Sequence, residues 1–97
     1  MGNTKLNQVS IGNYGNYSSD NYGSSRYVTI GSLTLYFSYK TVIAFENISG
    51  LTICQNDWGT TTGKHLNSIS TDKSKRIPYA QFKELLDKVL EIHGLAI

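Results

Sequence analysis

A run of alternating apolar and polar residues constrains the fold of this chain more than any other feature. In residues 27–39, YVTIGSLTLYFSY, one set of alternate positions is apolar: Leu33, Leu35, Phe37 and Tyr39. This period of two is typical of a strand with one buried face, and Gly31-Ser32 interrupts it as a two-residue turn. The run therefore predicts an antiparallel hairpin.

Further strands are expected on both sides of this hairpin. Residues 41–46, TVIAFE, and 51–55, LTICQ, are short apolar runs, and the turn between them (47–50) ends in Gly50, which tolerates a positive φ. Residues 6–11 can add a first strand. Four or five short strands joined by short turns are typical of an antiparallel meander.

A helical spacing replaces the alternation near the C-terminus. Pro78 suits the first position of a helix, and Gly94 suits its C-terminal cap. Between them, one helical face carries Phe82, Leu85, Leu86, Val89, Leu90 and His93. We therefore expect an α+β fold: one domain over residues 1–97, in which a small antiparallel meander is covered on one face by a C-terminal amphipathic helix.

A low-complexity segment, GNYGNYSSDNYGSS, occupies residues 12–25. It is expected to be a long loop, because its composition buries little apolar surface. The segment also suits a partner-binding surface that presents the rings of Tyr14, Tyr17 and Tyr22 among small adaptable residues. A third interpretation is that these rings stack on unpaired bases.

The stretch NDWGTTTGKHLN, residues 56–67, is the strongest candidate for a site. It resembles a phosphate-binding GxxxxGK[ST] loop, but the gap from Gly59 to Gly63 is one residue short and His65 replaces the Ser or Thr. We expect an ordered loop after the last strand, with Trp58 partly packed and Lys64 exposed. Three uses remain open: a turn that satisfies only its own backbone, an anion-binding nest beside Lys64 and His65, and a partner contact.

Positive charge is concentrated in the predicted loop 64–78. The net charge of the chain is +2, and this segment carries Lys64, Lys73, Lys75 and Arg76 against Asp72. The four cations are candidate phosphate contacts, although a solvated loop explains them equally well. So few charges predict weak, salt-sensitive binding to nucleic acid at most.

Catalytic residues are sparse. The single cysteine, Cys54, lies in a strand-like run and is expected to be buried. A Cys54–His65 nucleophile pair is conceivable but has no evident third member, and His93 fits the end of the helix better than a catalytic role. No spacing of ligands predicts a metal site, and no cofactor motif is present. The sequence therefore favours a protein that is not an enzyme.

Several segments together resemble a family of small uncharacterised proteins of phages and prophages. They are YSSDNYGS, LTLYFSYKTVIAF, WGTTTGKHLN and RIPYAQFKELLDKVL, and the likeness covers roughly residues 11–90. It brings no functional residues with it. It implies an accessory factor that binds a host protein or ribonucleoprotein complex, and such factors include inhibitors of host defences such as CRISPR effectors.

The expected function is accordingly that of a non-enzymatic interaction protein that modulates a host complex. Partner contacts are expected from Tyr14, Tyr17, Tyr22, Trp58, Lys64 and His65. The alternative is a small accessory protein that binds nucleic acid or a nucleotide phosphate. The N-terminus is too polar for a signal peptide, and no apolar run reaches the length of about 20 residues that a membrane span needs, so the host cytoplasm is the expected location.

Overall fold

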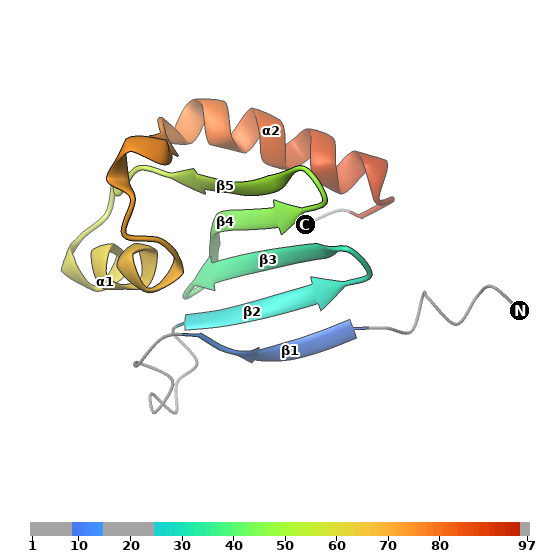
Figure 1. The fold of residues 1–97 in the computed structure, drawn as a ribbon, viewed down its shortest axis with the longest axis horizontal. Coiled ribbons are helices and arrows are strands. Elements are labelled where there is room, and N and C mark those ends of the chain that lie inside the picture. The colour runs from blue at the N-terminus through green and yellow to red at the C-terminus, as the bar shows by residue number, and fades with distance from the viewer. Residues whose placement is uncertain (1–8, 15–24, 96–97) are drawn as a thin grey trace, which may run out of the picture.

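A computed structural model describes residues 9–14 and 25–95 of the chain. These residues form a six-stranded sheet in the order β1-β2-β3-β4-β5-β6 and two α-helices (Figure 1). The strands are β1 (Val9–Asn13), β2 (Ser25–Ile30), β3 (Leu33–Ser38), β4 (Thr41–Asn47), β5 (Gly50–Cys54) and β6 (Arg76–Ile77). The helices are α1 (Thr60–Ile69) and α2 (Tyr79–Ile92), with a 3₁₀ turn, η2 (Lys73–Lys75), before β6.

The α+β class and the meander are confirmed. Neighbouring strands from β1 to β5 pair antiparallel, whereas β6 pairs parallel to β5. The two expected glycine positions also hold: Gly50 has φ +117° after the β4–β5 turn, and Gly94 has φ +70° just beyond α2. Both are backbone conformations that a side chain disfavours.

The helix α1 corrects two expectations, because it takes up residues 60–67 of the loop predicted for 56–67 and residues 64–69 of the basic loop predicted for 64–78. The rest of the basic segment contains η2 and β6. Its sequence, TTTGKHLNSI, is a poor helix former, with a glycine and several β-branched or short polar residues. Tertiary burial compensates, since Thr62, His65 and Leu66 lie at helical spacing and are all buried. The helix therefore exists because of what it packs on.

The two helices lie on opposite faces of the sheet. On one face, called here the α2 face, the side chains of Leu35 and Phe45 are cross-strand neighbours, and the Phe45 ring lies 5.6 Å from that of Phe82 in α2. The other, the α1 face, carries the side chains of Tyr36 and Ser38, and Ser38 hydrogen-bonds with His65 of α1. The protein thus has three layers rather than the predicted two.

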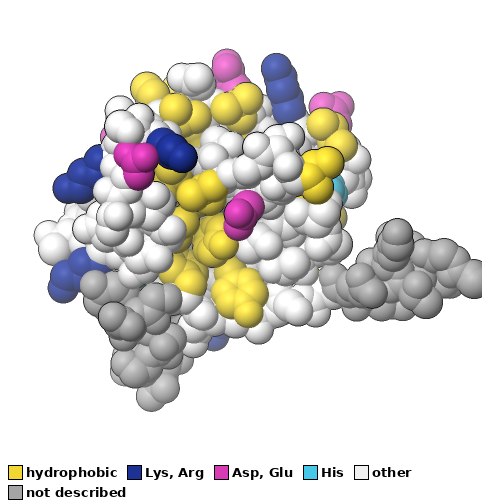
Figure 2. All heavy atoms as spheres, in the orientation of Figure 1, with side chains coloured by type: hydrophobic (Ala, Val, Ile, Leu, Met, Phe, Trp, Pro, Cys, Tyr) yellow, Lys and Arg dark blue, Asp and Glu magenta, His cyan; other side chains and the backbone are white. Residues whose placement is uncertain are grey.

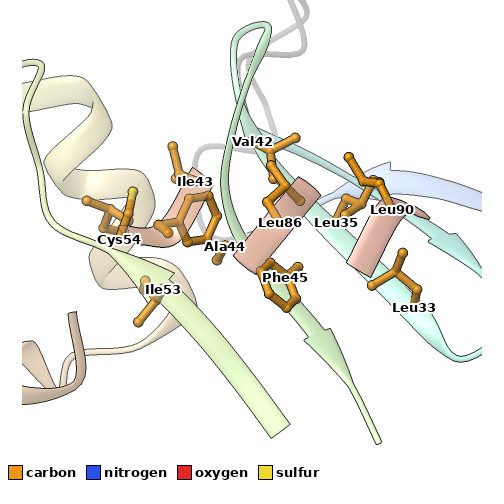
Figure 3. Packing of buried hydrophobic residues seen from close by; sticks show 12 residues of the cluster. Leu33, Leu35, Val42, Ile43, Ala44, Phe45, Ile53, Cys54, Leu86 and Leu90 are labelled. Carbon is orange, nitrogen blue, oxygen red and sulfur yellow. The ribbon is translucent and has the colours of Figure 1, made fainter. Parts of the chain in front are cut away.

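The strand β4 is buried on both sides as a result. Its register with β3 shifts at one point, so that Tyr36 pairs with Ala44 while Phe37 pairs with Val42, which leaves Ile43 as the extra residue of a β-bulge. Four consecutive residues of β4, Val42 to Phe45, are buried between the helices. Figure 3 shows them together with Leu86 and Leu90 of α2 and with Ile53 and Cys54 of β5.

The helices do not cover the whole sheet. Figure 2 shows apolar side chains forming a stripe across the exposed surface of the α1 face. On the α2 face, Val9 and Ile11 of β1 are exposed, at 49% and 66% of their surface. In the described residues no helix is long and apolar enough to span a membrane.

Candidate interaction site at the β3–β4 turn

Of the residues singled out in the sequence, Trp58, Lys64 and His65 lie at one end of the sheet, in the β5–α1 loop and in α1. The β3–β4 turn, the β5–α1 loop and the N-terminus of α2 all lie at the left of Figure 1, beside α1. The β5–α1 loop is held by one side chain: Asn56 Oδ1 accepts from the Trp58 N–H at 3.0 Å, and Asn56 Nδ2 donates to the Gly59 carbonyl at 3.0 Å. The loop is therefore fixed without a ligand.

Trp58 is half packed, as the sequence predicted. Its ring stands edge-on to that of Tyr79, with centroids 5.2 Å apart and planes at 88°. Tyr79 in turn lies 6.0 Å from Phe82 in the core. The indole still exposes 45% of the residue's surface, so Trp58 joins the core on one side and solvent on the other, which suits an anchor residue in an interface.

His65 differs from expectation, because it is only 1% exposed and cannot touch a partner directly. Its Nδ1 lies 2.8 Å from Ser38 Oγ, and the same oxygen lies 3.0 Å from Thr62 Oγ1. The three side chains form a buried polar network that joins α1 to the end of β3. A buried, hydrogen-bonded histidine of this kind fixes the position of a helix.

Tyr39 is the feature that the sequence analysis missed. The alternation predicts it on the same strand face as Leu35 and Phe37, but the strand ends at Ser38, and Tyr39 forms the β3–β4 turn with Lys40. Its φ is +57°, a left-handed conformation that costs a bulky residue free energy. Its ring is 59% exposed and lies 6.0 Å from the His65 ring. A turn between two strands without Gly, Asn or Asp was the available signal.

The β3–β4 turn is the shared wall of three hollows. A pocket of about 90 Å³ on the α1 side is lined by Ser38, Tyr39, Thr41, Ile43, Trp58 and Thr62. A hollow of about 360 Å³ on the α2 side is lined by Ile11, Arg26, Val28, Phe37, Tyr39 and Lys40. A groove of about 450 Å³ between this turn and α2 includes Lys40, Thr41, Tyr79 and Lys83 in its lining. Each of the three uses two residues of the segment Tyr39–Thr41.

The tyrosines of the low-complexity segment divide into two groups. Tyr14 is packed against the sheet: its hydroxyl donates to the Phe37 carbonyl at 2.7 Å, and its ring stands edge-on to Tyr36 at 5.4 Å. Burial raises the pKa of the Tyr14 phenol. Tyr14 is thus a structural residue rather than a loop residue awaiting a partner. Tyr17 and Tyr22 lie outside the described residues.

The candidate phosphate contacts also divide. Lys64, on α1, and Lys73 and Lys75, on η2, are exposed. Arg76 instead holds the end of α1, since its Nη2 donates to Asn67 Oδ1 at 2.8 Å and to the Ser70 carbonyl at 3.1 Å. Its guanidinium is committed to the fold, which removes it from the set of candidate contacts.

The structure contains the strand–helix–strand arrangement that surrounds a phosphate-binding loop, but it does not contain the loop itself. β5, α1 and the parallel strand β6 form a strand–helix–strand unit, which the sequence analysis did not expect. However, the helix already begins at Thr60, and the Gly63 N–H donates to the Gly59 carbonyl at 2.9 Å. The residues that would wrap a phosphate are therefore wound into the first turn of α1.

The Ser38–His65 pair has the residue types of a nucleophile and its base, but Ser38, like His65, is buried. A nucleophile must reach the substrate, and these side chains face the interior. Cys54 is buried as predicted, and burial raises the pKa of its thiol to about 11, which disfavours the reactive thiolate. No group of three metal-ligating side chains occurs within residues 9–14 and 25–95.

Residues 4–84 match the sequence profile of a family of unknown function, DUF8033. The chain belongs to this family, because the match covers most of its length. Neither the curated proteins nor the solved structures contain a match. The geometry of this DUF8033 protein is therefore the main guide to its function.

Proposed function

We propose that this DUF8033 protein is a non-enzymatic interaction protein whose partner contacts the turn surface, defined as Tyr39, Lys40 and Trp58. One observation carries the proposal: two exposed aromatic rings frame a pocket, and one of them is held in a strained backbone conformation. Tyr and Trp dominate the binding energy of protein interfaces, and strain of this kind clusters at functional sites.

The surroundings of the turn surface make it preorganised. Asn56 fixes the loop that carries Trp58, and the ring of His65, which belongs to the Ser38–Thr62–His65 network, lies 6.0 Å from the Tyr39 ring. A surface that is already ordered loses less entropy when a partner binds. The pocket of about 90 Å³ has room for part of one side chain, so a partner would insert one residue between the two rings.

The partner class in this proposal is a host protein or ribonucleoprotein complex. It rests on the resemblance to phage and prophage proteins, within which a modulator of a host defence complex, such as a CRISPR effector, is one case. The net charge of +2 is unsuited to imitation of DNA by an acidic surface. Binding would instead block part of the partner through shape and aromatic contacts.

The test is affinity capture with the immobilised protein from a lysate of the bacterial host, with and without nuclease. Trp58→Ala and Tyr39→Ala should lose the captured complex. Ile48→Ala is the matched control, because Ile48 is 92% exposed in the β4–β5 turn, outside the turn surface. If all variants capture the same proteins in the same amounts, the turn surface is not the interface and the proposal fails.

The alternative, binding of nucleic acid or a nucleotide phosphate, is favoured by one observation. Lys73 and Lys75 are exposed on the same short 3₁₀ turn, and Lys64 is exposed on α1. Arg76 is excluded from this set by its bonds to Asn67 and Ser70. If nuclease treatment removes the captured complex and substitutions in the turn surface do not, this alternative replaces the first proposal.

A further inference from the structure

The two edges of the sheet are unlike each other. The β6 edge is two residues long, contains Arg76 and is followed by Pro78. Short length, charge and proline are common devices that keep sheet edges from pairing with other chains. The β1 edge, VSIGN, has five residues and contains none of these devices.

The hydrogen-bond register shows which groups of β1 point outward. The Tyr14 N–H donates to the Ser25 carbonyl at 3.0 Å, so the residues of β1 at even positions face β2 with their N–H and C=O groups. The backbone groups of Val9 and Ile11 therefore point away from the sheet, and within residues 9–14 and 25–95 no strand pairs with β1 on that side. These are also the two residues whose side chains are exposed on the α2 face.

We infer that β1 pairs antiparallel with β1 of a second copy, with the two-fold axis passing beside Ser10. In this register Val9 lies opposite Ile11 of the other copy, so the outward N–H and C=O groups of both residues find partners. Ser10 lies opposite its own counterpart. A dimer of this kind is closed and symmetric, and each copy supplies the same patch.

The side chains favour this register. On the α2 face, Ile30 is the cross-strand neighbour of Val9, and Val28 is that of Ile11. Pairing the two edges extends these rows into an apolar ladder across the interface, and such cross-strand pairs stabilise a sheet. β1 carries no charged side chain, so the interface brings no like charges into opposition.

The first test is the oligomeric state. Sedimentation velocity from micromolar to millimolar protein should show a species of twice the 10.8 kDa chain mass that grows with concentration. Ile11→Pro should abolish it, because proline removes only an outward N–H at this position. Ile11→Thr keeps the N–H and should weaken the dimer much less. A monomer at every concentration, or a dimer that tolerates Ile11→Pro, would overturn the inference.

The second test fixes the register and does not depend on the folding of a proline variant. Under oxidising conditions Ser10→Cys should form a disulfide-linked dimer, since directly opposed residues of a non-hydrogen-bonded pair have Cβ atoms close enough to bridge. Ile11→Cys should not, because Ile11 faces Val9. The native Cys54 is buried and does not interfere. Efficient linkage through Ile11→Cys alone would show the register to be wrong.

This inference is independent of the proposed function. Trp58→Ala removes a ring of the turn surface and should leave the dimer unchanged. Conversely, Ser10→Lys places a charge beside the two-fold axis and should weaken the dimer. Its Kd should rise at least about tenfold, which corresponds to a free energy of about 1.4 kcal/mol. An effect of Trp58→Ala equal to that of Ser10→Lys would place the contact between copies at the turn surface and overturn the edge pairing.

Discussion

Tyr39 combines an exposed ring with backbone strain. The strain lowers the stability of the fold, whereas the exposed ring favours binding to a partner. A left-handed conformation costs an ordinary residue free energy that glycine does not lose. In this protein the cost is borne by an aromatic side chain that lines two of the three hollows. Glycine or asparagine would be more stable at this turn. What tyrosine adds at position 39 is therefore its exposed ring.

Tyr39→Gly is therefore expected to be more stable than Tyr39→Ala by about 1–2 kcal/mol, because both lose the ring and only glycine relieves the strain. Both variants should lose partner binding to the same degree. Equilibrium denaturation and the capture assay measure the two effects. Equal stability of the two variants would mean that the turn relaxes without cost, and retained binding in either would remove Tyr39 from the interface.

Cys54 gives a prediction for alkaline pH. Burial is the main reason that the pKa of its thiol rises from 9.0 to about 11 in the folded protein, whereas the unfolded chain keeps the ordinary value. The folded state therefore binds the proton more tightly. This contribution to stability is complete below about pH 9 and is lost as the pH rises from about 9 to about 11.

The free energy of unfolding should accordingly fall over this range, and Cys54→Ala should show a shallower fall. Part of the slope will persist in the variant, because burial also raises the pKa values of Tyr14 and Tyr36. Chemical denaturation at a series of pH values measures both curves. Parallel curves for the two proteins would show that the Cys54 thiol does not contribute.

At the scale of elements, the two helices owe their existence to different causes. α2 has apolar residues at helical spacing and many good helix formers. On its inner face Phe82, Leu86 and Leu90 are buried. α1 lacks both and depends on Leu66 and the polar network below it. Its formation therefore requires the sheet to be in place.

Leu86→Ala should destabilise the protein by about 2–5 kcal/mol, because Leu86 is 3% exposed and its removal leaves a cavity between α2 and β4. Leu85→Ala is a control of identical chemistry on the same helix, since Leu85 is 37% exposed, and should cost clearly less. Equilibrium unfolding in urea measures both. Similar losses in the two variants would mean that α2 does not dock through the face described.

At the scale of the whole molecule, charge is modest and dispersed. The exposed cations Lys64, Lys73 and Lys75 lie on α1 and η2, and Asp72 caps η2 by accepting from the Ser74 N–H at 3.1 Å. Three partly compensated cations do not make the extended basic surface of a dedicated nucleic-acid binder. The interaction proposal and the phosphate alternative therefore predict different responses to salt.

Any binding to single-stranded DNA should be weak and should fall steeply with salt. Combined Lys73→Ala and Lys75→Ala substitutions should reduce the slope of log K against log[salt] by about 1.4 if both lysines contact phosphates, since each phosphate contact on a single strand contributes about 0.7. Fluorescence anisotropy with a labelled oligonucleotide measures this. Tight, salt-insensitive binding that depends on Trp58 would instead show that bases stack on the turn surface.

Much of the architecture could be read from the sequence. The alternation in residues 27–39, the break at Gly50 and the helical period after Pro78 determined the strands β2 to β5 and the helix α2, because each signal is local. The burial of Cys54 and the half-packed Trp58 followed from the same reasoning. Such features depend on residues that are neighbours in the chain, so they can be predicted without knowledge of the rest of the fold.

The candidate site was decided by tertiary structure. His65 and Tyr14 were candidate contacts, but each is held in the fold by a partner more than twenty residues away in the chain, Ser38 and Phe37, respectively. Arg76 is held by Asn67, nine residues earlier. Tyr39 shares the alternation of the apolar face of β3, but the strand ends at Ser38, and Tyr39 lies exposed in the turn with φ +57°. No local pattern encodes a hydrogen bond across more than twenty residues or the strain of a turn, because both arise only when the sheet closes. The sequence alone thus determined which elements form, and their packing decided which side chains remain exposed to a partner.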